Sequence, residues 1–482
     1  MTTHTTTTSS TLAPTSLRAT VSLEQQAVNT SNSRNKDSFA TTYYHLTVEL
    51  NEASDIPAMI DYLQTNILHD NSTGVVSVLT IQSESSEGEP DWTNPESHDN
   101  YQQLFQCLAS LPTLHKIQIK DVGMGRRKFP ISLMTTLLQN SHGKSHLKCL
   151  DLDAADLIAT PEDLHAFALV LRQNHTSVDE FYLEFSDWAV AGCSTATKIL
   201  MQEAFLQLPL LHTLSIRAFI EMGTVDSASL RSLLANAGDL QQFRLEFFDL
   251  QDEHMESIAE GLHNANATQT RTRTTSIVNI DISYCTLEKR GIRAIADIIQ
   301  LNLPTLQQLK IGVSDQREVD DSDYLLDNDE HREATTRNHT RSSWTDLVEP
   351  SLTTIATALQ SNNTLTHLDL HGRPRYISNA TRIAFANTLE RYNFTLERLQ
   401  LLDGFLHRDN IDCMPTERLR FFLRLNRNGN RKKLLETQAK IVPVMDEWIN
   451  VMANHSHDVP VLHYYLQHNP ALLLVCQKQR WK

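Results

Sequence analysis

Glycine and proline are scarce in this chain, with 14 and 15 among 482 residues, which excludes collagen-like and low-complexity proteins. The sequence has no apolar run long enough for the core of a signal peptide or for a membrane span. Basic residues are outnumbered, and the formal net charge is −16. Because nucleic acids and anionic membranes both attract basic surfaces, we expect neither as a partner. The balance favours a soluble protein that binds other proteins.

Close pairs of cysteines are also missing. The six cysteines lie far apart, and no C-x-x-C motif occurs. Cys149 falls on a predicted strand and Cys285 at a predicted turn, so both are interpreted as small buried apolar side chains. Free cysteines are typical of a reducing compartment. We therefore expect a cytoplasmic protein, with a nuclear or organellar location as the alternative.

Motifs of catalysis are absent as well. The sequence contains no G-x-S-x-G, no P-loop, no H-E-x-x-H and no set of kinase motifs. We predict neither an enzyme nor a bound cofactor. Catalytic groups that converge from distant segments would escape such a search.

What the sequence does contain is a repeat, clearest between residues 277 and 303. Its first half, from Ile277 to Leu287, fits the pattern L-x-x-L-x-L-x-x-C-x-L, in which a short strand turns at a buried Cys or Asn. In its second half, apolar residues follow a helical period of i, i+3, i+4 and i+7: Ile292, Ile295, Ala296 and Ile299. A unit of one strand and one helix buries its apolar faces only by stacking on a neighbouring unit.

Ten more copies of the strand pattern precede or follow this unit. The eleven copies begin at residues 43, 76, 114, 147, 178, 211, 240, 277, 306, 365 and 396. Most steps between copies are near thirty residues, and three gaps carry a further helical stripe. The stripes are Leu164, Phe167, Ala168 and Leu171; Ile355, Ala356 and Leu359; and Ile383, Ala384, Ala386 and Leu389. This regular spacing predicts a solenoid over residues 41–411.

Three segments depart from the repeat. Residues 1–40 are rich in Ser and Thr and poor in acids, and we expect them to be disordered, with a transit peptide as the alternative. Residues 315–346 form an acidic insert without apolar periodicity, interpreted as an exposed loop. Its acids do not fit an EF-hand, because Leu325 and Leu326 stand at positions 5 and 6 counted from Asp321.

Residues 412–482 are predicted to form a helical cap, because an open solenoid exposes an apolar end. One helix begins near Pro415, a second follows Pro443, and a third spans residues 459–468. The basic run from Arg424 to Lys433 is interpreted as a charged helix end and linker, with phosphate binding as the alternative. His463 and His468 are five residues apart, which is not the spacing that places two metal ligands on one helical face, so no metal is predicted.

A strand, a Cys-type turn and a full helix in 28 to 33 residues resemble the ribonuclease-inhibitor-like branch of leucine-rich repeat proteins. The likeness is best at residues 277–303 and 352–370 and covers residues 40–410. It implies an α/β solenoid shaped as a curved horseshoe, with parallel strands on the concave face and helices on the convex face. Most copies carry another residue where Cys285 stands, as with Ala155 and Phe248. The likeness to solenoid GTPase activators lies in the fold alone.

Side chains alternate along a strand, so residues between the buried positions point together onto the concave face. The candidates for partner binding are Lys116, Lys120, Asp151, Asp153, Glu180, Tyr182, Glu184, Arg217, Arg244 and Glu246. One interpretation is an acidic surface around Tyr182 that suits a basic partner segment. The other is a solvated row of charges that neutralises itself, in which Lys120 faces Asp153 and Arg217 faces Glu184 and Glu246.

From these patterns we expect a non-enzymatic interaction scaffold that holds a protein partner on the concave face. The sequence does not specify the partner's identity. Two alternatives remain open at this point: a regulator of an enzyme, as an inhibitor or GTPase activator, and a substrate receptor of a ubiquitin ligase.

Overall fold

The computed structural model describes a large part of the chain. The described residues are 21–26, 43–50, 56–65, 75–82, 95–111, 114–120, 129–139, 146–152, 157–185, 193–218, 225–236, 238–246, 248, 250–267, 276–313, 349–372, 377–401, 414–427, 431 and 459–468. They fall into two compact units, unit 1 from Met1 to Cys285 and unit 2 from Thr286 to Lys482.

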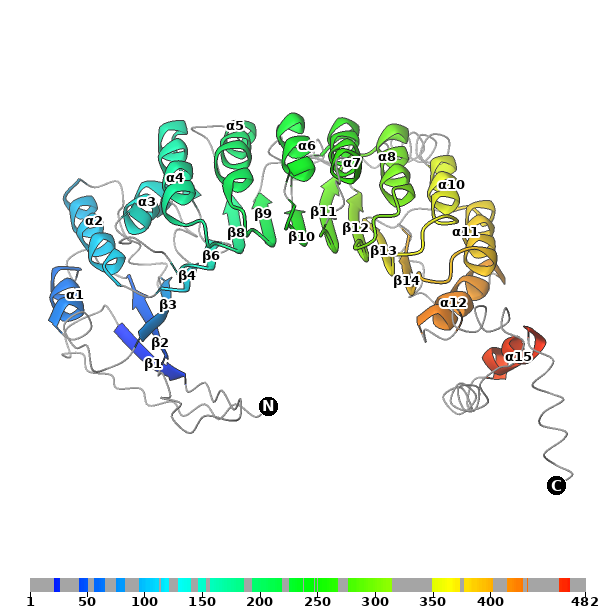
Figure 1. Ribbon diagram of the computed structural model, residues 1–482, viewed down its shortest axis with the longest axis horizontal. Coiled ribbons are helices and arrows are strands. Elements are labelled where there is room, and N and C mark those ends of the chain that lie inside the picture. Colours follow the sequence, from blue (N-terminus) through cyan, green and yellow to red (C-terminus); the bar gives the residue numbers. More distant parts are fainter. Residues whose placement is uncertain are drawn as a thin grey trace, which may run out of the picture. The chain divides into compact units, whose positions relative to one another are not determined.

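Unit 1 alternates strands and helices along the chain (Figure 1). Its main strands are β1 (Val21–Gln26), β2 (Tyr43–Glu49), β3 (Val75–Gln82), β4 (Lys116–Lys120), β6 (Cys149–Leu152), β8 (Glu180–Phe185), β9 (Thr213–Ala218), β10 (Gln242–Glu246) and β11 (Asn279–Cys285). Its helices are α1 (Ile56–Leu63), α2 (Pro95–Ala109), α3 (Ile131–Gln139), α4 (Pro161–Asn174), α5 (Cys193–Ile199), α6 (Ser227–Asn236) and α7 (Asp252–Ala267). A small second sheet pairs β5 (Phe129–Pro130) with β7 (Leu157–Ile158).

Strands β2 to β11 pair in chain order, and every one of these pairs is parallel. The pairing confirms the predicted repeat, because equivalent residues of successive copies are direct partners. One buried row across the sheet reads Leu46, Leu79, Ile117, Leu150, Phe181, Leu214, Phe243 and Ile280. This row faces the helices: the ring of Phe181 lies 6.4 Å from that of Phe167 on α4. Parallel strands that alternate with helices are compatible with an α/β solenoid.

Main-chain hydrogen bonds fix the register at the start of each strand. The carbonyl of His115 accepts from two successive amides of the next repeat, Lys148 N–H and Cys149 N–H, at 2.8 and 3.0 Å. The carbonyls of Lys148, Asp179, His212 and Gln241 do the same one repeat further on. Because each carbonyl binds two amides, a shift of one residue would break both bonds.

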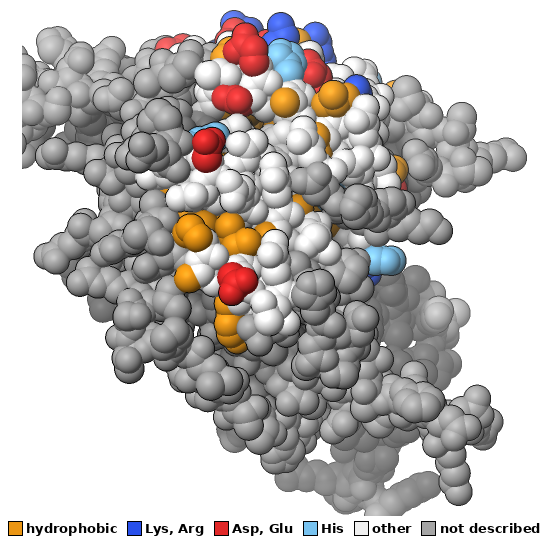
Figure 2. All heavy atoms as spheres, turned by 90° about the vertical axis from the view of Figure 1, so that its left-hand side faces the viewer, with side chains coloured by type: hydrophobic (Ala, Val, Ile, Leu, Met, Phe, Trp, Pro, Cys, Tyr) orange, Lys and Arg blue, Asp and Glu red, His pale blue; other side chains and the backbone are white. Residues whose placement is uncertain are grey.

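Strand β1 corrects the expectation of disorder for residues 21–26. It pairs antiparallel with β2, Val21 with Val48 through Gln26 with Tyr43. The expectation was based on the average composition of forty residues, and a strand of six residues changes that average little. Its pairing depends on main-chain groups, which composition does not reveal. Figure 2 views the structure from the left-hand side of Figure 1, and Lys, Arg, Asp and Glu side chains gather at the top of this view.

Unit 2 follows the same alternation. It contains α8 (Lys289–Gln300), β12 (Gln308–Val313), α10 (Glu349–Ala358), β13 (His367–Gly372), α11 (Asn379–Arg391), β14 (Arg398–Gln400), α12 (Met414–Arg427) and α15 (Val459–His468). Strands β12, β13 and β14 are parallel neighbours. With the eight strands from β2 to β11, a strand lies at each of the eleven predicted positions.

The helical stripes are confirmed with one exception. Those of α4, α8 and α10 are buried as expected. On α11, however, Ile383 is 42% exposed, whereas Ala386 and Leu389 of the predicted stripe are buried together with Phe385 and Arg382. Arg382 takes the buried position that was assigned to Ile383, because a search for apolar residues passes over an arginine.

A row of buried asparagines joins the repeats of unit 2. Asn393 donates to the carbonyls of Leu359 and Asn362, both at 2.9 Å, and its Oδ1 accepts from the amides of Thr395 and Leu396 at 3.2 and 2.9 Å. Asn362 and Asn426 hold equivalent positions and are equally buried. Asn362 donates to the carbonyl of Ile299, and Asn426 to those of Asn393 and Leu396. The asparagine row, these three residues, therefore satisfies main-chain groups of successive repeats.

Arg431 differs from the other arginines of the basic run, which was interpreted as a charged helix end and linker. Its side chain is 1% exposed, whereas Arg424 and Arg427 are exposed as expected. It donates to the carbonyls of Leu389 and Glu390, which are among the last carbonyls of α11 and lack helical partners. Further bonds of 3.2 Å reach Asn426 Oδ1 and the hydroxyl of Tyr464 on α15.

Three aromatic rings complete the surroundings of Arg431. The guanidinium carbon lies 4.6 Å from the ring centre of Phe394, 4.8 Å from that of Phe422 and 5.6 Å from that of Tyr464. Stacking on aromatic faces stabilises a buried guanidinium. The result is a cluster that links the end of α11 to α12 and to α15.

Two sequence expectations lie outside the described residues. They are the acidic insert 315–346, with its calcium hypothesis, and the helix expected after Pro443.

Candidate functional site on the strand face of unit 1

The sheet of unit 1 has one face toward its helices and one away from them. We call the second the strand face. It carries the alternate side chains of β4 to β11 that lie between the buried positions. Parallel pairing aligns these side chains in rows that run across the sheet, and neighbouring strands lie about 4.8 Å apart. Eight of the ten candidate residues are therefore brought into neighbouring pairs or rows on this face.

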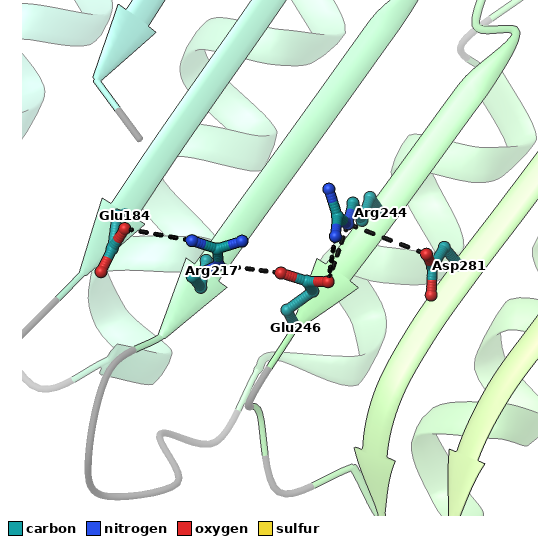
Figure 3. Close-up of polar contacts among 5 residues, drawn as sticks. All are labelled: Glu184, Arg217, Arg244, Glu246 and Asp281. Atoms are coloured by element: carbon teal, nitrogen blue, oxygen red, sulfur yellow. Dashed lines mark hydrogen bonds and ion pairs between the residues drawn. The ribbon is translucent and has the colours of Figure 1, made fainter. Parts of the chain in front are cut away.

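Five charged residues form an ion-pair ladder across β8, β9, β10 and β11 (Figure 3). Arg217 Nε lies 2.8 Å from Glu246 Oε2, and Arg217 Nη1 lies 3.5 Å from Glu184 Oε2. Arg244 donates to Glu246 Oε1 and lies 3.8 Å from Asp281 Oδ2. The ladder alternates in sign along its length, in the order Glu184, Arg217, Glu246, Arg244 and Asp281.

Two acids of the ladder, Glu184 and Glu246, are buried, whereas Asp281 and the two arginines are partly exposed. Glu184 and Glu246 are 8% and 7% exposed, so the expectation of a fully solvated row is wrong for them. Burial alone would raise the pKa of Glu246. Hydrogen bonds from Arg217 and Arg244 and their positive charge outweigh it, and the pKa lies below its usual value. The arginines therefore hold Glu246 ionised under the surface.

A second cluster lies on β4 and β6. Asp151 accepts from Gln118 Nε2 at 2.7 Å and pairs with Lys116 Nζ at 3.3 Å. Lys116 and Gln118 of β4 thus both bind Asp151 on the adjacent strand, and Lys116 compensates its charge. Pairs that are partly exposed to water contribute about 0 to 1 kcal/mol to stability.

Between the two clusters lie Glu180 and Tyr182 of β8. The Tyr182 hydroxyl donates to Glu180 Oε2 at 3.4 Å, and the Glu180 side chain is exposed. Burial raises the pKa of Tyr182 to about 12, and the charges of Glu180 and Asp151 contribute. In register with Glu180 is Cys149, which is buried and free. The pKa of this thiol is also raised to about 12, mainly by burial.

Lys120 and Asp153 are the two candidates that the structure does not bring together. Lys120 is half-buried at the end of β4 and aligns with Gln82 of β3. Asp153 lies outside the described residues, so their expected contact stays a prediction.

The strand face also includes residues that the sequence analysis left out of the site. Asp281 extends the ladder, and on β2 and β3 His45 bonds to Thr80 at 2.8 Å and Gln82 donates to Glu49 at 3.1 Å. The signal for them was the same alternation along β2, β3 and β11 that selected the other candidates.

Metal binding finds no support in the part of the chain that is described. It holds no group of three or more His, Cys, Asp or Glu side chains arranged around a common point. His463 is exposed on α15. Cys107, Cys149 and Cys285 are free and buried, as expected for the last two. Among the described residues, no helix is long and apolar enough to cross a membrane.

Comparison with known proteins adds no family to this description. No model of a known protein family matches the chain, and no curated protein is found to be similar to it.

Proposed function

We propose that this protein is a leucine-rich repeat solenoid of the ribonuclease-inhibitor-like type and that it binds a protein partner on the strand face of unit 1. The observation that carries the proposal is the register of β4 to β11. It aligns charged and aromatic side chains in rows on the sheet face that the helices of unit 1 leave uncovered (Figure 1). Tyr and Arg, both present there, are enriched among residues that dominate binding energy.

The geometry favours binding over catalysis. The arginines of the ladder are held by carboxylates, and the thiol of Cys149 has a pKa near 12, so it is protonated at neutral pH. A surface of this kind offers charge complementarity and orientation to a partner. The three cysteines of the described residues form no disulfide and are buried, which supports a reducing compartment such as the cytoplasm.

The test is capture of the partner from native extract with matched variants of the full chain. One bait carries Tyr182→Ala with Lys120→Glu on the strand face. The control bait carries Tyr392→Ala with Asp297→Lys, exposed positions in unit 2. We expect a stoichiometric protein with the wild type and the control, and its loss with the strand-face bait. If the strand-face bait retains the same protein, the proposal is wrong.

The identity of the captured protein then separates the remaining classes. An enzyme or a small GTPase would make the chain a regulator, whereas a ligase adaptor would make it a substrate receptor. A protein without such activity would fit a scaffold.

A further inference from the structure

The acids of the strand face are not all compensated. Strands β6 to β11 present five described acidic side chains on this face: Asp151, Glu180, Glu184, Glu246 and Asp281. Four of them are in ion pairs with Lys116, Arg217 or Arg244 at 2.8 to 3.8 Å. Glu180 is the exception among the described residues. Its contacts are the Tyr182 hydroxyl and the Cys149 thiol, which are both uncharged.

The neighbours of Glu180 leave its carboxylate accessible. Cys149 on one side and Thr213 on the other are its partners in register, and both are short. Tyr182, two residues further along β8, aligns with Asp151 and with the short side chain of Ser215. Glu180 and Tyr182 therefore stand above a floor of small side chains.

The local field around Glu180 is negative. The pKa values of Cys149 and Tyr182 are raised mainly by burial, and the charges of Glu180 and Asp151 raise both further. Lys116 opposes this effect at Cys149, but it is already paired with Asp151. A positive charge added beside Glu180 would relieve this unbalanced negative charge.

We infer that Glu180 and Tyr182 form an acceptor for one arginine side chain of the protein partner. The guanidinium pairs with the Glu180 carboxylate and lies against the Tyr182 ring. This inference rests on the proposed function, because it names the group that the strand face recognises. A planar guanidinium both pairs with a carboxylate through two N–H groups and stacks on an aromatic ring, whereas a lysine ammonium is a compact charge.

The test uses a random dodecapeptide library displayed on phage and selected on the folded full chain. We expect selected peptides to share an arginine at one position. Binding of a synthetic selected peptide, measured by isothermal titration calorimetry, should weaken about tenfold or more with Glu180→Gln, because a charge-assisted bond contributes about 1.5 to 3 kcal/mol. With Tyr182→Leu it should weaken about threefold. The matched control is Glu162→Gln, an exposed glutamate on α4, which should leave binding unchanged.

A double-mutant cycle completes the test. Replacing the peptide's arginine by glutamine should cost at least about tenfold against the wild type and no more than about threefold, the share of the Tyr182 ring, against Glu180→Gln. An equal loss against both proteins, or no selected peptide that depends on Glu180, overturns the inference. Peptides that lose binding to the Tyr182→Ala, Lys120→Glu bait without depending on an arginine would overturn it and leave the proposed function standing. Circular dichroism melting curves for each variant show whether the fold is intact.

Discussion

The buried Asn393 gives the sharpest prediction about stability. Its side chain is fully buried and satisfies four main-chain groups, the carbonyls of Leu359 and Asn362 and the amides of Thr395 and Leu396. Asn393→Ala removes all four hydrogen bonds at once. At about 1 kcal/mol for each bond, the expected loss in the free energy of unfolding is about 4 kcal/mol. Water that enters the space left behind would reduce this figure.

The measurement is urea unfolding followed by circular dichroism, together with hydrogen exchange resolved by peptide. Unit 2 should lose protection around α11 and β14, while the peptides of unit 1 keep theirs. The control is Asn363→Ala, one residue beyond Asn362, where the side chain is exposed. It should change stability by less than about 0.5 kcal/mol. If Asn393→Ala costs no more than this control, the asparagine row does not hold the repeats together and the reasoning fails.

Three further outcomes are expected. Arg431→Met should destabilise unit 2 by about 3 kcal/mol in urea unfolding, since it leaves carbonyls of α11 unpaired, and Arg431→Lys should not restore stability because a lysine lacks the planar fork. Gly261→Ala should lower the melting temperature, because an added Cβ would lie 2.8 Å from the carbonyl oxygen of Arg231, on the neighbouring helix α6. The free energy of unfolding should fall by about 1 to 3 kcal/mol. Cys149 should resist iodoacetamide at pH 8, as peptide mass spectrometry would show, whereas unfolded chain reacts. The pKa of this thiol is raised from 9.0 to about 12. The stability that the buried, protonated thiol contributes is therefore complete below pH 9 and is lost as the pH rises toward 12.

The strands were predictable because their signal is local and repeated. Each copy places the same apolar residues at the same spacing, and parallel register follows when equivalent residues stack. The same logic anticipated that Arg217 contacts Glu184 and Glu246. The bond from Arg244 to Glu246, two residues along the same strand, was not anticipated, because a row of equivalent positions does not include contacts along one strand.

Burial of polar residues was harder to predict. Arg431 was assigned to a charged helix end and linker because it was judged together with its basic neighbours in sequence. Its partners are carbonyls about forty residues away, at the end of α11. The asparagine row left a visible signal, the shared Asn-x-Thr-Leu before two strands, at Asn362 and Asn393. Its meaning depends on carbonyls of the preceding repeat, which a sequence pattern does not locate.

The main-chain bonds at the start of each strand have a consequence for protein engineering. Thr366 and His367 both donate to the carbonyl of Gln307, and β13 stays in register with β12, although Thr366 and Gln307 are 59 residues apart. The number of residues between β12 and β13 therefore does not determine the register of the two strands. We therefore expect that a change of chain length between Val313 and Glu349 leaves the register of β12 and β13 unchanged.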